Sequence, residues 1–491
     1  MSSIAESSSL VNNERAREHT RQGATALAGL LTLVLLAATL EIVLDGAVGH
    51  SPLIPKSPGI ASWLVGVGER LGYRVFLIAL LSYCGAFAGI LLLTRRISSR
   101  WAIALTVALQ LIVFVGPVLI STDVFSYIAY ARMGIVHGIN PYLHGPSSIA
   151  ADPVFRYVGK DWLKVATAYG PLYTLLSYPL APLGVVGALW GMKLEALAAS
   201  AGTLAVTWRC ARVRGLDPKF ALIVVGVNPL WVIYGLGGAH NDLIMTLLLM
   251  GAVALTFASE QRGAAAGGDS EEGIGQGGGV GQGGGVGRGR GADSGGLRAE
   301  VAYAFQAGSR RETYAGAAVI GATLIKATGI VPLPFILLSR RRLAPLIGAV
   351  LAAAGGALLA YAVFGVHGVD IVSALNRDAA FVGTDSFPTE IAHLLGKPGV
   401  FPIDHDLLKA GLVLIVLHLM WRTWRGYDWV AASAWTLLAI AVTSTWLLAW
   451  YTLWSLPLAA VSRDRRVLYA TLAVQALFIA HQIAPLLAPV S

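Results

Sequence analysis

Apolar residues recur along the chain in runs of about 20 positions, separated by short polar segments. Runs of that length match a helix that crosses a bilayer, and they lack the alternating pattern of a membrane β-barrel. Backbone amides cannot stay unpaired in hydrocarbon, so the runs predict membrane-spanning α-helices. The expected spans are 24–44, 73–93, 101–121, 186–208, 220–236, 243–258, 343–364, 408–421, 429–446, 449–462 and 467–488.

The apolar run at 314–338 differs from the others because Gly329, Pro332 and Pro334 interrupt it. Proline removes a backbone donor and breaks a helix, so we expect a pair of short helices here that enters the membrane and returns. With this pair included, the pattern predicts about 13 transmembrane helices.

The composition supports the same fold class and explains the positive net charge. Apolar residues make up 56% of the 491 positions and charged residues 13%, about half the density typical of a soluble protein. We therefore expect an all-α polytopic membrane protein. The net charge of +9 indicates basic loops beside the membrane rather than a nucleic-acid partner. Two cysteines, Cys84 and Cys210, do not predict a disulfide framework or a zinc site.

Lysine and arginine gather in alternate loops, and cytoplasmic loops are the ones rich in these residues. Clear examples are Arg15–Arg21, Arg95–Arg100, Arg340–Arg342 and Arg463–Arg466. We therefore expect a multi-pass plasma-membrane protein with the tail 1–23 in the cytoplasm. The same orientation makes three longer segments extracytoplasmic, namely 45–72, 122–185 and 365–407.

Two transmembrane modules are expected from this topology, 24–258 with the outer loop 122–185 and 314–491 with the outer loop 365–407. Between them lies the loop 259–313, which contains repeats such as GQGGGVGQGGGVGRGRG. Such a sequence cannot bury enough apolar surface to offset the entropy of ordering, so we expect a disordered cytoplasmic linker.

The stretch STDVFSYIAYARMG (121–134) places an acid where the third span leaves the membrane. Asp123 stands there among aromatic residues, and a partly desolvated carboxylate of this kind is suited to act as a general base for a sugar hydroxyl. The alternative role is structural, because Ser121, Thr122 or Asp123 can cap the helix that follows. The two roles are compatible.

A second polar group lies in the turn between the fifth and sixth spans. His240, Asn241 and Asp242 offer a donor, an acceptor and a carboxylate to sugar hydroxyls, on the same outer side as Asp123. The alternative is a helix start with Asn241 or Asp242 as its N-cap.

Lys326 stands inside an apolar run, next to a helix break. An intramembrane lysine is costly, and this one could meet a lipid-borne phosphate at membrane depth. The alternative is a side chain that extends to the interface.

Near the C-terminus, Trp450 and Tyr451 belong to an aromatic stretch that is either an interfacial belt or a platform for a sugar ring or a polyprenyl chain.

Several other classes of chemistry are not indicated. The histidines lack metal-ligand spacing, and no phosphate-binding or dinucleotide glycine motif is present, so neither a metal nor a cofactor is expected. No cytoplasmic segment is large enough to bind a nucleotide sugar. A sugar donor would therefore be lipid-linked and would approach from within the bilayer.

Together these motifs resemble the GT-C membrane glycosyltransferases, and most closely the actinobacterial polyprenol-phosphomannose-dependent α-(1→6)-mannosyltransferases that extend the mannan of lipomannan. The resemblance covers about 100–460 in order. It rests on STDVFSYIAYARMG with HGINPY, AYGPLY (168–173), VNPLWVIYGLGGAHNDLIM (227–245), LIKATG (324–329) and WYTLWSLPLAA (450–460).

The resemblance implies a polyprenyl-phosphate-mannose donor, a mannosylated glycolipid acceptor and metal-independent inverting transfer on the extracytoplasmic side, with Asp123 as base. The growing charge of the leaving phosphate needs cations or donors. For this donor site we expect Lys326, Arg132, His240, Asn241 and Arg377. For the acceptor site we expect Tyr127, Tyr169, Tyr173, Asp242, Trp450 and Tyr451.

Three rival interpretations remain at this point. A flippase or other transporter of lipid-linked sugars would place ionisable residues near the bilayer midplane and show internal repeats, whereas the charges here lie mostly in loops, with Lys326 the main exception. A non-catalytic subunit of an envelope-assembly complex would not depend on Asp123. A third possibility keeps the fold and changes the sugar of the donor.

Overall fold

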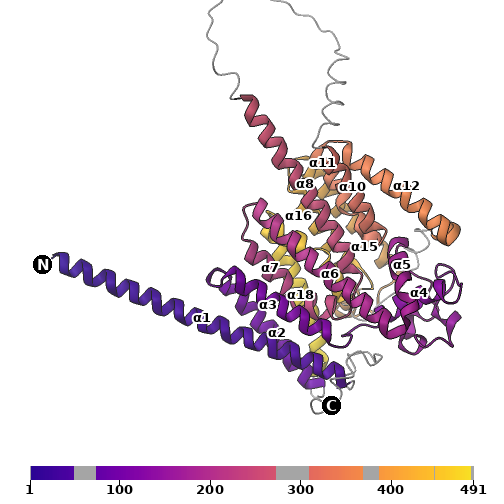
Figure 1. Ribbon diagram of the computed structural model, residues 1–491, viewed down its shortest axis with the longest axis horizontal. Helices are drawn as coiled ribbons and strands as arrows, with labels where there is room; N and C mark the ends of the chain where they lie inside the picture. The colour runs from indigo at the N-terminus through magenta and orange to yellow at the C-terminus, as the bar shows by residue number, and fades with distance from the viewer. Residues whose placement is uncertain (1, 49–72, 272–308, 369–385, 447, 488–491) are drawn as a thin grey trace, which may run out of the picture.

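The computed structural model describes residues 2–48, 73–271, 309–368, 386–446 and 448–487. Within these ranges the chain is built from helices and their connections, without a strand. The expectation of an all-α fold is thus confirmed. Figure 1 shows one main helical body from which the N-terminal half of the first helix extends.

The N-terminal helices are α1 (Ser2–Val48), α2 (Tyr73–Leu93) and α3 (Ser99–Val115), with α1 packed on both of the others. The Ser98 hydroxyl accepts a hydrogen bond from the Trp101 amide at 3.2 Å and so caps the start of α3. At its other end α3 stops at Val115, before Gly116 and Pro117. Proline cannot continue a helix, so the chain turns there toward Asp123.

The segment after α3 folds back as α4 (Asp123–Ile135) and α5 (Pro171–Ser177), which pack on each other (Figure 1). Short helical turns join them to the rest of the chain. The turns described in this and other connections are η2 (Thr94–Arg96), η3 (Pro146–Ile149), η4 (Phe155–Tyr157), η5 (Lys160–Trp162), η6 (Tyr178–Leu183) and η10 (Gly365–Gly368).

The centre of the body is formed by α6 (Gly184–Val213), α7 (Pro218–Gly226), η7 (Leu230–Leu236) and α8 (Asp242–Glu271). A bend of 48° separates α7 from η7. Asn228 stabilises this bend, because its side-chain oxygen accepts hydrogen bonds from the backbone amides of Leu230 and Trp231. α8 continues to Glu271, into the segment expected to be disordered, and the rest of that expectation lies outside the described residues.

The interrupted run near 314–338 forms α10 (Ser309–Thr323), η9 (Ala327–Ile330) and α11 (Pro332–Arg340), followed by α12 (Ala344–Phe364). The run is thus divided as expected, but α10 ends at Thr323, before Gly329, and Pro332 and Pro334 lie in the first turn of α11. α10 and α12 approach closely, since a Cβ atom added at Gly316 would lie 1.8 Å from the Pro345 carbonyl oxygen.

The C-terminal helices complete the body. They are α14 (Phe387–Leu394), α15 (Pro402–Trp424), α16 (Trp429–Thr443), η11 (Ala449–Leu453), α17 (Leu456–Val461) and α18 (Arg465–Leu487). The expected span at 449–462 is consequently two short helices, η11 and α17, with Trp454 and Ser455 between them.

Among the described residues, five helices are long and apolar enough to cross a membrane, or six if the bent pair of α7 and η7 counts as one span. Helices α3, η9 with α11, and α16 are apolar but shorter. The protein is thus a polytopic membrane protein, whereas the expected total of about 13 spans is not confirmed.

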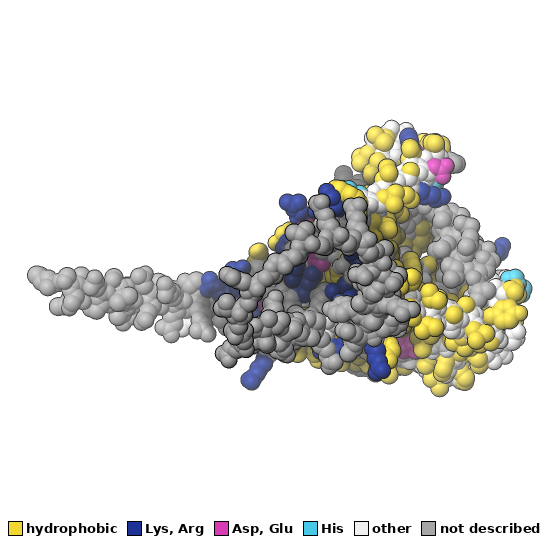
Figure 2. Space-filling model, turned by 90° about the horizontal axis from the view of Figure 1, so that it is seen from above, with side chains coloured by type: hydrophobic (Ala, Val, Ile, Leu, Met, Phe, Trp, Pro, Cys, Tyr) yellow, Lys and Arg dark blue, Asp and Glu magenta, His cyan; other side chains and the backbone are white. Residues whose placement is uncertain are grey.

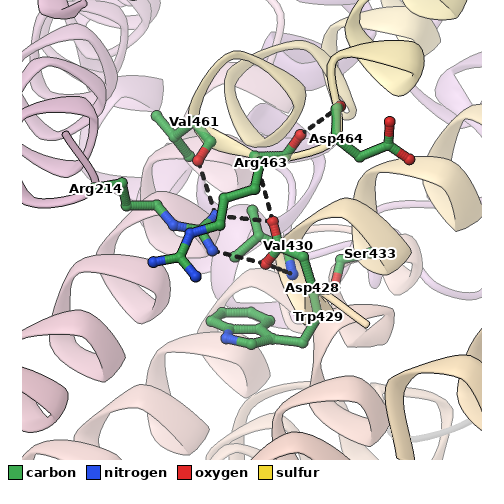
Figure 3. A network of polar contacts seen from close by, with 9 residues as sticks. Arg214, Asp428, Trp429, Val430, Ser433, Val461, Arg463 and Asp464 are labelled. Atoms are coloured by element: carbon green, nitrogen blue, oxygen red, sulfur yellow. Dashed lines mark hydrogen bonds and ion pairs between the residues drawn. The ribbon is translucent and has the colours of Figure 1, made fainter. Parts of the chain in front are cut away.

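The two ends of the body differ in their charged residues. Asp242 begins α8, and fifteen residues later Phe257 lies under the Arg214 guanidinium, with its ring centroid 4.8 Å from Cζ. At 1.5 Å per residue these two points are about 22 Å apart along the helix. Figure 3 shows the network around Arg214. Figure 2, which looks down from above the view of Figure 1, shows several groups of Lys and Arg side chains on the part of that face that is coloured by residue type.

Candidate active site

Asp123 is the first residue of α4, and the tightly folded connection between α3 and α4 fixes its position. Ile120 has a positive φ of 67°, and the Leu119 amide donates to the Gly237 carbonyl oxygen at 2.9 Å. The Asp123 amide donates to the Ser121 hydroxyl at 3.1 Å, whereas Thr122, at the N-cap position, makes no side-chain capping bond. Asp123 follows the N-cap position, so its carboxylate is not the cap.

The Asp123 residue is only 6% exposed. Burial raises the pKa of Asp123 to about 7, opposed by the Lys326 ammonium and reinforced by the Asp242 carboxylate; hydrogen bonds from the side chains of Ser121 and Trp162 lower it. A carboxyl group with this pKa is half ionised at neutral pH and can accept and release a proton there.

The turn between η7 and α8 brings His240 to Asp123. Ala239 has a φ of 51°, and His240 Nδ1 lies 3.7 Å from the nearer Asp123 carboxylate oxygen. The Tyr127 hydroxyl, one turn along α4 from Asp123, lies 3.4 Å from the same nitrogen and donates to Asn241 Oδ1 at 3.5 Å. Burial lowers the pKa of His240 to about 3, so the ring is neutral and can either donate or accept a hydrogen bond.

Three consecutive residues of this turn carry buried polar atoms without a hydrogen-bond partner. They are His240 Nε2, Asn241 Nδ2 and Asp242 Oδ2. Leaving such atoms unpaired costs about 1–3 kcal/mol each, so native proteins rarely do so unless a ligand, an ion or water completes the site. The turn is therefore arranged as one side of a polar binding site.

Lys326 joins the same cluster from the break between α10 and η9. Its ammonium lies 2.9 Å from Asp242 Oδ1, and the Trp454 indole N–H donates to the same oxygen. The ammonium also lies 4.6 Å from the Tyr451 ring centroid and 5.0 Å from that of Trp454. With 17% of its side chain exposed, Lys326 is held inside the cluster rather than extended toward an interface.

Aromatic rings enclose the cluster. The Tyr127 ring contacts Tyr169 and Tyr173 edge-on, with centroids 4.7 and 5.1 Å apart, and the His240 ring stacks on Trp450 at 3.9 Å. Trp450 and Tyr451 therefore lie in the cluster instead of forming only an interfacial belt.

A glycine allows the Tyr169 segment to reach Lys326. The Gly170 amide donates to the Ile325 carbonyl oxygen at 3.0 Å, and a Cβ atom at Gly170 would lie 2.1 Å from the Leu324 carbonyl oxygen. Only glycine permits this approach. The outer loop and the break that carries Lys326 are thereby joined directly.

Two residues expected at the donor site are not part of this cluster as described. Arg132 forms an ion pair with Asp152 at 2.9 Å and donates to the Ala181 carbonyl oxygen at 3.1 Å. It lies nine residues beyond Asp123 on α4, about 13 Å along the helix. Arg377 lies outside the described residues.

Lys193, which was not among the predicted site residues, lies on α6 and is 1% exposed. Its ammonium donates to the carbonyl oxygens of Val113, Gly116 and Pro117 at 3.2, 2.6 and 3.3 Å. These are unpaired carbonyls at the end of α3, so Lys193 caps that helix and fixes the chain that leads to Asp123. The signal was a lysine inside an apolar run, the same signal that singled out Lys326.

Lys193 and Glu195 correct the expectation that charged residues lie mostly in loops, which had spoken against a transporter. Both ionisable side chains lie within a helix long enough to span the membrane. Lys326 is thus not the main exception to charges in loops.

Trp454 was not among the predicted site residues either, although it belongs to the aromatic stretch around Trp450. Among the described residues, no group of three or more His, Cys, Asp or Glu side chains could hold a metal ion.

Comparison with known proteins identifies the family. Residues 26–342 match the model of the alpha-(1→6)-mannopyranosyltransferase N-terminal domain. The chain belongs to this family. The matched region contains Asp123, the 240–242 turn and Lys326, while Trp450 and Tyr451 lie beyond it.

Curated relatives agree with this assignment. Alpha-(1→6)-mannopyranosyltransferase A of Mycobacterium tuberculosis is 26% identical over 91% of this chain and 82% of the relative. The protein of the same name from Corynebacterium glutamicum is 27% identical over 40% of this chain and 39% of the relative. No solved structure matches the chain. The expected resemblance to mannosyltransferases is confirmed.

Proposed function

We propose that this mannosyltransferase moves mannose from polyprenyl-phosphate-mannose to a mannan-type glycolipid and forms α-(1→6) links with inversion at C1. One observation carries the proposal: a buried acid whose pKa lies near 7 faces a neutral histidine, an ammonium and three unpaired polar atoms. This combination supports proton transfer from a hydroxyl beside a negatively charged leaving group.

Asp123 acts as the general base in this mechanism. The acceptor 6-hydroxyl loses its proton to the carboxylate while its oxygen attacks C1 of mannose from the face opposite the phosphate. The C1–O bond to the phosphate breaks, and the bonding electrons leave with the polyprenyl phosphate. One carboxylate is sufficient, because the departing polyprenyl phosphate, a phosphate monoester, is a good leaving group and needs no strong acid.

Lys326 stabilises the departing phosphate. An ammonium has three N–H donors, and the contact with Asp242 uses one of them. Asp242 thus orients Lys326 and leaves N–H donors of the ammonium for the phosphate. The Tyr451 and Trp454 rings hold the charge at this position. Electrostatic stabilisation of this type commonly contributes about 10²–10³ in rate.

The remaining cluster residues bind sugar. His240 Nε2 and Asn241 Nδ2 are placed to pair with hydroxyl groups of the donor, since both lack protein partners. Tyr127, Tyr169 and Tyr173 form the side of the cluster next to Asp123, which we assign to the acceptor. The stacked pair of Trp450 and His240 provides an apolar face of the kind that sugar rings contact.

We further propose that the cluster faces the extracytoplasmic side of the plasma membrane and that the N-terminus is cytoplasmic. The support is the distribution of arginine along α8: Asp242 begins this helix, whereas its far part contacts Arg214, Arg311 and Arg340. Basic residues prefer the cytoplasmic side.

An assay in membranes tests the proposal. Polyprenyl-phosphate-mannose and a short α-mannoside are supplied with and without chelator, and an Asp123→Asn variant is compared with Asp161→Asn, which removes an exposed acid of the same loop. We expect transfer that chelator does not change and that only Asp123→Asn abolishes. Activity from GDP-mannose in membranes unable to make the lipid-linked donor would refute the donor assignment. Preference for polyprenyl-phosphate-glucose would assign another sugar.

A further inference from the structure

A polar cavity of about 630 Å³ lies at the end of the body that carries Arg214, some 22 Å along α8 from the Asp123 cluster. We call it the basic pocket. Three arginines and two aspartates line it, together with Tyr427, Ser339 and two further residues. Its volume is within the range that binds small ligands.

Both acids of the basic pocket are fully engaged by the protein. The Asp428 carboxylate accepts two hydrogen bonds from the Arg214 guanidinium, at 2.8 and 2.9 Å, and one from the Arg463 backbone amide at 2.9 Å (Figure 3). The Asp464 carboxylate accepts hydrogen bonds from the Tyr427 hydroxyl and the Arg466 backbone amide. Arg214 compensates the charge of Asp428, whereas the donors to Asp464 are neutral and its carboxylate is compensated in part by the Arg466 charge. With three arginines against two aspartates, the lining keeps one net positive charge.

The guanidinium groups of Arg463 and Arg466 remain available. Both residues are exposed, and neither guanidinium forms an ion pair or hydrogen bond with any residue in the described ranges. Figure 3 shows the Arg463 side chain extended past the Arg214–Asp428 pair, with only its backbone bonded to Asp428. The basic pocket therefore offers two arginine forks to an anion, and arginine forks match phosphate oxygens closely.

Exposed aromatic residues indicate the depth of the basic pocket in the membrane. Trp421 and Trp424 occupy the last turn of α15, just before the lining residue Tyr427, and Tyr469 follows Arg466 in the first turns of α18. Their exposed fractions are 51%, 53% and 62%. In membrane proteins, exposed tryptophan and tyrosine side chains concentrate at the level of lipid headgroups. The arginine forks therefore lie close in the chain to residues of the kind that occupy the headgroup level.

We propose that the basic pocket binds the phosphate of an anionic phospholipid headgroup through Arg463 and Arg466, at a site separate from the Asp123 cluster. The inference does not depend on the donor or acceptor of the transfer reaction. Basic pockets between helices of membrane proteins are suited to such headgroups, and binding here would link the adjoining ends of α11, α16 and α18, which carry or flank the lining residues.

Thermal unfolding of the purified full-length protein tests this proposal. The midpoint is measured in detergent with added phosphatidylglycerol, phosphatidylcholine or inorganic phosphate, because a ligand that binds only the folded state raises it. We expect phosphatidylglycerol to raise the midpoint more than phosphatidylcholine. The double variant Arg463→Gln/Arg466→Gln should lose at least half of that difference.

The matched control is Arg95→Gln/Arg96→Gln, which removes the same charge from two exposed arginines outside the basic pocket. It should keep the difference. Ser339→Trp fills the pocket without changing its charge and should reduce the difference between the two lipids. This variant replaces the double variant if the latter fails to fold. If only inorganic phosphate raises the unfolding midpoint, and the double variant loses that rise, the phosphate site is supported and its ligand is a soluble phosphate. Equal lipid responses in the double variant and its control would overturn the proposal.

Discussion

The Asp123 cluster and the basic pocket each combine an acid at the start of a helix with a nearby cation, but they use the acid differently. At the basic pocket, both oxygens of Asp428 are bonded to Arg214 and to backbone amides. At the Asp123 cluster, Asp242 bonds Lys326 and Trp454 through one oxygen and leaves the other buried and unpaired.

This difference indicates what each pair does. A buried ion pair with every oxygen satisfied holds helices together, and its removal leaves an uncompensated charge. Buried polar atoms that stay unpaired reduce stability, and active sites are where proteins retain them. We therefore expect substitutions at the Arg214–Asp428 pair to change stability and substitutions around Asp123 to change turnover.

The largest expected effect is on turnover at Asp123. Asp123→Asn keeps the shape but removes the base, so kcat should fall by about 10²–10⁴-fold. Thermal unfolding should stay close to that of the wild type, because no ion pair is lost. The measurement is initial-rate kinetics with radiolabelled donor, with Asp161→Asn as the control. Retention of more than a tenth of wild-type kcat would remove Asp123 from the mechanism.

The opposite outcome is expected at the Arg214–Asp428 pair. Arg214→Leu leaves the Asp428 carboxylate, which is 10% exposed, without its main partner and should cost about 3 kcal/mol of unfolding free energy. The folded fraction should keep its kcat. Arg212→Leu removes an exposed arginine from the last turn of α6, which ends just before Arg214, and is the control for charge alone. A loss of kcat with unchanged stability would reverse the assignment of the two regions.

Lys193 tests whether the approach to Asp123 must be held in place. Lys193→Met removes the donor to three carbonyl oxygens at and just beyond the end of α3, and a small displacement of a catalytic group costs up to about 10²-fold. We expect kcat to fall by about tenfold or more with the donor KM changed less than about twofold. Lys193→Gln, which keeps two N–H donors, should restore part of the rate. Equal kcat and KM losses in both variants would indicate general unfolding instead.

The smallest effect is a displacement of the pH profile. Because the base must be ionised and the pKa of Asp123 is about 7, kcat/KM should rise about tenfold per pH unit below 7 and level off above it. The Lys326 ammonium lowers this pKa, so Lys326→Met should move the rising limb to higher pH as well as reduce the plateau. A limb that stays at the same pH in Lys326→Met would show that another group titrates.

Much of the candidate site could be predicted because its residues are chemically unusual for their surroundings. Asp123, Lys326 and the His240–Asp242 turn are polar residues within or beside apolar runs, and such residues are costly unless they have a task. Lys193 satisfied the same criterion and was overlooked. Trp454 could not be separated from neighbouring aromatic residues, since exposure and direction depend on the fold.

The sequence by itself determined that the chain is helical and lies in a membrane, and that the run at 314–338 is broken, because these properties depend on local hydrophobicity and on proline and glycine. Tertiary structure alone decided which charged groups meet: Arg132 contacts Asp152, whereas Lys326 contacts Asp242, 84 residues away in the chain. Such pairs form when helices pack and water is excluded, and no local pattern encodes that geometry.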